Sequence, residues 1–97
     1  MATTPDLTAI DTAIHAVGPI KGVSALHALE RPDGGLVVVA RVGLSPALRL
    51  AEIVFAISEV EHAVRQADPR VQAVFVEPDI AADAATPTET IVIRALD

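Results

Sequence analysis

The 97-residue sequence has no cysteine, no tryptophan and no tyrosine, and it has only two phenylalanines. Without cysteine, disulfides and zinc sites with thiolate ligands are excluded, so a metal ion would have to be held by His, Asp, Glu, backbone or water. The hydrophobic share is nevertheless 52%, so we expect a core of closely packed aliphatic side chains. Such a core is thin in a chain of this length, and association with another chain could supplement it.

Basic residues are also few, because seven Lys and Arg stand against thirteen Asp and Glu, which gives a formal net charge of −6. This charge repels phosphate backbones and anionic lipid, which argues against nucleic acid as a partner. The longest aliphatic runs, at residues 36–40 and 53–57, are far shorter than the ~20 residues of a membrane span, so we expect no direct membrane insertion. The N-terminal segment lacks the basic and apolar regions of a signal peptide, which predicts a cytoplasmic protein.

Apolar periodicity and turn signals divide the chain into helices and strands. Paired cap and proline residues indicate where two helices begin, and a run of proline, aspartate and two glycines predicts a tight turn between two strands. The predicted elements are a helix at about 5–17, strands at 22–30 and 36–44, a helix from Ser45-Pro46 to Asp68-Pro69, a strand at 71–77 ended by Pro78, and a strand at 90–96.

This order of elements predicts a single α+β domain over residues 1–97, with an antiparallel or mixed sheet and both helices on one of its faces. Residues 79–89 are rich in Ala, Asp, Thr and Pro and are predicted to form a flexible connection. The strands contain valines that cannot all face the helices. A partner subunit is an economical cover for the second face, so we expect a homodimer. The valines concerned are Val37, Val39, Val74 and Val76.

Five consecutive segments resemble the cytoplasmic C-terminal domain of the cation diffusion facilitators, here without a membrane part. They are GVSALHALE, a glycine turn, a valine-rich strand, LRLAEIVFAISEVEHAVR and DPRVQAVFVEP. The resemblance covers most of the chain but not residues 79–97. It implies a metallochaperone-like or ferredoxin-like two-layer fold that dimerises in the cytoplasm, binds divalent transition metal ions at the dimer interface and regulates a metal efflux transporter.

Two origins fit this resemblance, a domain excised from a transporter or a gene product consisting of this domain alone, and the start of the sequence and its late strand favour the second. The implied ligand is a zinc-like divalent ion, with cadmium as a surrogate and no organic cofactor. The implied partners are a second copy and the matching domain of a membrane metal transporter. Two alternatives stay open: an interaction module that only dimerises because its metal site is degenerate, and a small-molecule sensor of similar architecture.

The resemblance also implies which residues hold the metal. His27 stands at the position of a first-strand histidine that is often a ligand, and Glu77 stands at the acidic position before the proline of the third strand. Three other histidines of the family correspond to Arg41, Val54 and Phe75. The implied site is therefore degenerate, and an arginine close to it would repel a cation.

Other histidines give weaker candidates. Asp11 and His15 are four residues apart on the first helix, where they could share a metal ion or form an exposed pair. His62 could donate from a solvated face of the second helix. His27 itself has a structural alternative, as a partly buried strand histidine hydrogen-bonded to backbone.

Nothing in the sequence predicts an enzyme. No serine lies in a recognisable nucleophile motif. The glycine pair at residues 34 and 35 lacks the lysine and the following helix of a phosphate-binding loop.

Overall fold

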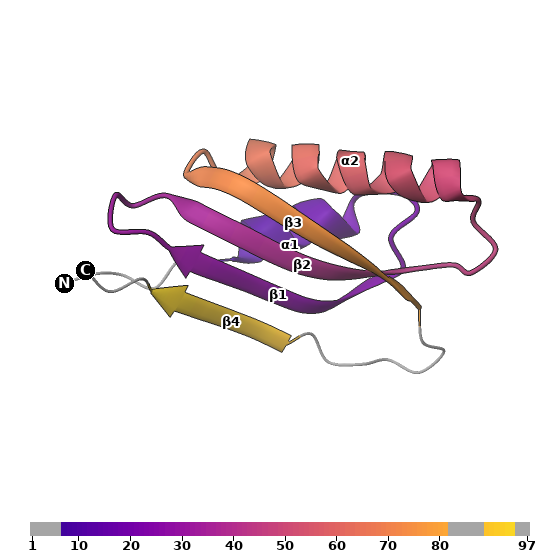
Figure 1. Cartoon of the computed structure of the whole chain (residues 1–97), viewed down its shortest axis with the longest axis horizontal. Coiled ribbons are helices and arrows are strands. Elements are labelled where there is room, and N and C mark those ends of the chain that lie inside the picture. The colour runs from indigo at the N-terminus through magenta and orange to yellow at the C-terminus, as the bar shows by residue number, and fades with distance from the viewer. Residues whose placement is uncertain (1–6, 82–88, 95–97) are drawn as a thin grey trace.

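The computed structural model describes residues 7–81 and 89–94. The elements follow the predicted order, helix, strand, strand, helix, strand and a late strand, which confirms the α+β, ferredoxin-like class (Figure 1). They are α1 (Thr8–His15), β1 (Gly22–Glu30), β2 (Leu36–Leu44), α2 (Leu50–Ala67), β3 (Val71–Ile80) and β4 (Glu89–Arg94).

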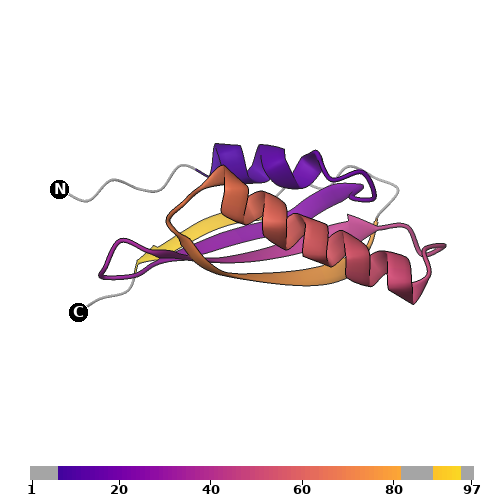
Figure 2. The same cartoon turned by 90° about the horizontal axis from the view of Figure 1, so that it is seen from above.

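The four strands form one mixed sheet in the order β3-β2-β1-β4. β1 and β2 are an antiparallel hairpin, β3 runs parallel to β2, and β4 runs parallel to β1. Both helices lie on the same face of this sheet (Figure 2). α1 contacts β1, and α2 contacts both β3 and α1, so the two helices make a second layer.

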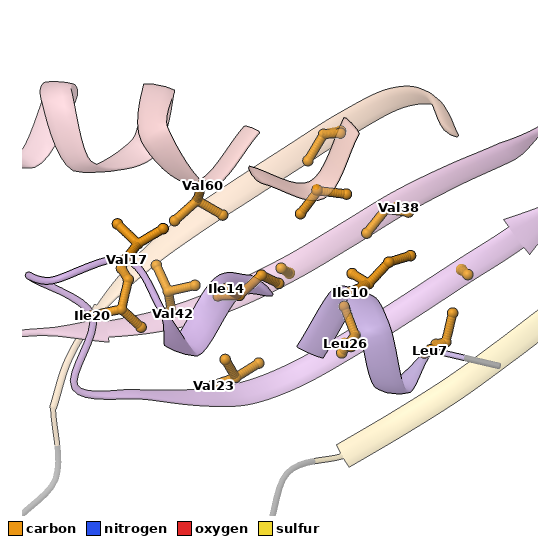
Figure 3. Packing of buried hydrophobic residues seen from close by; sticks show 14 of the residues in the cluster. Leu7, Ile10, Ile14, Val17, Ile20, Val23, Leu26, Val38, Val42 and Val60 are labelled. Carbon is orange, nitrogen blue, oxygen red and sulfur yellow. The ribbon is translucent and has the colours of Figure 1, made fainter. Parts of the chain in front are cut away.

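The core lies between the helices and the sheet and is entirely aliphatic among the described residues, since no polar or charged side chain there is buried (Figure 3). The alternate residues of β2 that face the helices are all buried. Each large aliphatic side chain that is fully buried contributes about 1.5–3 kcal/mol relative to an exposed one. The largest are Ile10, Ile14, Leu26, Leu36, Val38, Val42, Val60 and Val64.

The predicted glycine turn joins β1 to β2. Gly34 has φ of 88°, a left-handed conformation that L side chains rarely adopt. Asp33 accepts hydrogen bonds from the Gly35 N–H at 2.9 Å and from Gln72 Nε2 at 3.1 Å. The hydrogen bond from Gly35, followed by the one from Gln72, lowers the pKa of Asp33 below its ordinary value. The bond from Gln72 also ties the hairpin to the start of β3.

The second helix begins at Leu50, so its predicted start at Ser45 and Pro46 is wrong. Ser45 instead closes a turn, in which its hydroxyl oxygen accepts a hydrogen bond from the backbone N–H two residues later. The helix start is capped by Glu52, whose carboxylate accepts a hydrogen bond from the Arg49 N–H at 2.9 Å. A serine followed by proline suits both a cap and a turn, and the local sequence does not distinguish them.

The first helix is shorter than predicted, because it ends at His15. The predicted cap and proline before it, Thr4 and Pro5, lie outside the described residues. The helical spacing of apolar residues in α2 predicts that Leu50 is buried, but its side chain is 76% exposed. Burial on α2 is confined to its middle and C-terminal part, at Ala56, Val60 and Val64.

Pro78 does not end the third strand, which continues to Ile80. β3 is an edge strand, and a proline is tolerated there because its missing N–H costs no hydrogen bond on the side that has no neighbour. In the parallel register Pro78 lies opposite Val42.

The predicted flexible connection at 79–89 is wrong at both ends, because residues 79 and 80 belong to β3 and Glu89 begins β4. Its middle, residues 82–88, lies outside the described part of the chain. The predicted strand at 90–96 is present as Glu89–Arg94, and its last two residues also lie outside the described part.

Candidate functional site

One face of the sheet is covered by the two helices, and no described element covers the other (Figure 2). We call this uncovered surface the open face. Side chains alternate between the two faces of a strand, so the residues between the buried ones lie on the open face. They are Ala25, His27 and Leu29 of β1, Val37, Val39 and Arg41 of β2, and Ala73, Phe75 and Glu77 of β3.

The apolar residues on the open face bear out the expectation that strands are apolar on both sides. Val37 and Val39 lie there. Val74 and Val76 instead pack against the core on the helix side, and Phe75 is the large apolar residue that β3 places on the open face.

The strand register arranges the open face in rows. In the central row, Phe75 is paired with Val39 and Val39 with His27. Phe75 is 60% exposed and Val39 is 40% exposed, while His27 is half-buried. His27 therefore follows two exposed apolar side chains in this row, and on its other side its strand pairs it with Ile91 of β4.

The two principal candidates for metal ligands, His27 and Glu77, both lie on the open face, but their strands are not neighbours in the sheet. β2 lies between their strands, so their backbones are about 10 Å apart sideways, and Glu77 is also displaced along the strand, opposite Arg41. Donors to zinc must lie about 2 Å from the ion. The residues that the structure describes contain no group of three His, Asp or Glu able to hold a metal ion, so His27 and Glu77 do not form a complete site within one chain.

The next row of the open face contains Ala25, Arg41 and Glu77, with Arg41 in the middle. Arg41 forms an ion pair with Glu77. Its Nη2 lies 3.3 Å from Glu77 Oε1 and 3.4 Å from Oε2. The sequence indicated that Arg41 would repel a cation, but not that it would engage Glu77, because that contact depends on β3 lying parallel to β2. By itself one chain does not fit a metal ion at this face: the acidic donor is already paired, and the histidine lies two strands away.

The weaker candidates lie in the helix layer, away from the open face. His15 Nδ1 is 2.9 Å from the Asp11 backbone oxygen and 3.5 Å from its Oδ1. The bond to a carbonyl oxygen makes Nδ1 the donor. Both side chains are exposed over nearly half their surface. Of the two alternatives for Asp11 and His15, a shared metal ion or an exposed pair, this geometry matches the exposed pair. His62 is exposed on α2.

Sequence reasoning missed a second group of exposed apolar residues, at the N-terminal half of α2. It consists of Leu50, Val54 and Phe55, and Phe55 is 64% exposed. The helical spacing of apolar residues does not reveal this group, because Leu50 falls in the same spacing as residues that are buried farther along α2.

Comparison with known proteins identifies the fold. No protein-family profile and no curated protein matches this sequence. Among solved structures, the copper form of the MamM CTD has a TM-score of 0.80 at 18% identity, covering 95% of this chain and 93% of that one. The manganese form of a MamM CTD variant has a TM-score of 0.75 at 20% identity, covering 84% and 88%.

A cadmium form of another MamM CTD variant has a TM-score of 0.71 at 19% identity, covering 76% of this chain and 90% of that one. MamM CTDs are C-terminal domains of cation diffusion facilitators. The chain therefore has the fold that its resemblance to this family implied. No helix in residues 7–81 and 89–94 is long and apolar enough to cross a bilayer.

Proposed function

We propose that this chain is a non-enzymatic cytoplasmic domain of the cation diffusion facilitator type, which forms a homodimer, binds a divalent transition metal ion between its two chains and so contributes to the regulation of metal efflux. Zinc is the proposed ion, with cadmium as its surrogate. The fold supports this, and so do the copper, manganese and cadmium forms of the MamM CTD. The observation that carries the proposal is the position of His27 on the open face.

The absence of a complete ligand set in one chain supports a shared site. Since no group of three donors lies together in the described part of one chain, the proposed site takes donors from a second one. A two-fold axis through the open face places the same surface on both sides, so that each donor is present twice. The histidine of one chain can then lie near the carboxylate of the other, with water completing the coordination.

The open face also provides the contact that brings two chains together. Phe75 and Val39 are exposed and adjacent, and removing such side chains from water favours association. The net charge of −6 opposes the approach of two identical chains but raises the concentration of cations near them. A bound divalent ion would offset part of this repulsion, which couples metal binding to the stability of the dimer.

Calorimetric titration of zinc into the purified chain, paired with thermal unfolding, tests the proposal. Zinc should release or absorb heat beyond dilution and raise Tm, because it binds the folded dimer preferentially; at 100 times Kd the gain is about 2.7 kcal/mol. His27→Ala should weaken binding at least about tenfold. The matched control is His62→Ala, which removes an exposed histidine from the helix layer.

Two results would contradict the proposal. One is wild-type protein that gives no heat with either zinc or cadmium. The other is an equal loss of affinity in the His27 and His62 variants, which would place binding on surface histidines in general.

A second candidate function is an interaction module that dimerises without metal, and the pairing of Arg41 with Glu77 favours it because it already neutralises the acidic candidate. In that case zinc would leave Tm unchanged. Mixing the chain with the C-terminal domain of a metal transporter would then give a heterodimer in native mass spectrometry. Failure of the two to exchange would argue against this candidate.

A further inference from the structure

The open face carries a permanent positive charge beside its acidic residue. Arg41 is on the central strand β2, and its guanidinium lies within 3.4 Å of both carboxylate oxygens of Glu77. A guanidinium keeps its charge at any pH at which the protein folds. A cation that binds Glu77 therefore shares the carboxylate with the positive charge of Arg41 or displaces it.

We infer that Arg41 competes with the divalent ion for Glu77, so that the open face contains its own inhibitor of metal binding. This inference rests on the proposed function, because it concerns the regulation of that same site. The metal and the guanidinium compete for the same two carboxylate oxygens of Glu77. Arg41 thereby raises the metal concentration at which the domain responds.

The exposure of the pair sets the size of this effect. The Arg41 and Glu77 side chains are 47% and 61% exposed, and exposed ion pairs contribute little to stability. The guanidinium is therefore displaced at a modest cost, and competition weakens metal binding without abolishing it. Repulsion between the guanidinium and a nearby divalent ion adds to the effect and is reduced by salt. Removing Arg41 should tighten zinc binding about three- to tenfold.

A purely structural role for the pair predicts something different. If Arg41 served only to connect β2 to β3, its replacement would lower the stability of the fold without changing the affinity for metal. The affinity for zinc, measured on folded protein, therefore separates the two roles.

The experiment is a double-mutant cycle followed by zinc titration calorimetry on the full chain. Arg41→Met removes the charge and keeps much of the side-chain length, and Arg41→Gln serves as a second variant should the first fold poorly. Each is measured with Glu77 present and in the Glu77→Gln background. Arg65→Met is the matched control, since it changes the net charge equally from an exposed position on α2.

We expect the Arg41 variants to bind zinc several-fold more tightly when Glu77 is present, and the gain to disappear in the Glu77→Gln background. An equal gain from Arg65→Met, an equal gain in both backgrounds, or no gain at all would overturn it while leaving the proposed function intact. Absence of zinc binding in the wild type and in every variant would instead refute the proposed function, and this inference with it.

Discussion

Replacing Phe75 by alanine tests whether the open face is the interface of the proposed homodimer. A phenylalanine side chain can bury about 200 Å², and Phe75 is 60% exposed, so about 120 Å² per chain remains to be covered by a partner. Over two chains, at about 25 cal/mol per Å², this corresponds to at most about 6 kcal/mol. Alanine keeps part of that contact, so we expect a loss of about 3 kcal/mol, which raises the dimer Kd about 100-fold.

Sedimentation velocity over a range of protein concentrations, with a chelator present, measures this Kd without a contribution from metal. Phe55→Ala is the matched control, because Phe55 is 64% exposed but lies in the helix layer on α2. The reasoning would be refuted if Phe75→Ala left the Kd unchanged. It would also be refuted if Phe55→Ala raised the Kd as much, since the helix layer would then contribute to the interface.

Two further predictions concern the fold. Gly34→Ala should lower the free energy of unfolding by about 1–2 kcal/mol, because the φ of Gly34 is positive. Gly18→Ala is the control and should leave this free energy unchanged, because an added Cβ at residue 18 meets nothing within 4 Å. Urea denaturation of the two variants measures the difference. The hydrogen bond from the Arg70 guanidinium at 2.7 Å lowers the pKa of Asp68 in the folded state. The ionised carboxylate therefore stabilises the fold fully at pH values above its unfolded pKa of about 3.9. This stabilisation is lost as the pH falls through the lower pKa of the folded state. Asp68→Asn should therefore cost about 1 kcal/mol at pH 7, and urea unfolding should show no difference from wild type at strongly acidic pH.

The hairpin was the most predictable part of the fold. The bounds predicted for its strands, 22–30 and 36–44, are those observed for β1 and β2. Their β-branched residues and the glycine turn act over short distances, so the local sequence contains the necessary information. The start of α2 and the end of β3 depend on tertiary context. Ser45 makes a turn because the chain must leave β2, and Pro78 stays in a strand because that strand is at the edge of the sheet.

His27 and Glu77 were named as metal ligands from the resemblance, and these roles stay predictions; their arrangement was not predicted. Alternation along each strand places both residues on the open face once the strand register is known. Their separation and the pairing of Glu77 with Arg41 both follow from β2 lying between β1 and β3. Strand order is set by packing among distant segments, and no local signal specifies it.

Pro78 has a consequence for solubility at high concentration. An exposed edge strand is a template to which a strand of another molecule can add, and repeated addition builds fibrils. β3 presents such an edge, but its proline offers no amide hydrogen to an incoming strand. Lateral addition of strands along this side of the sheet is therefore interrupted at Pro78, which protects the β3 edge against open-ended polymerisation.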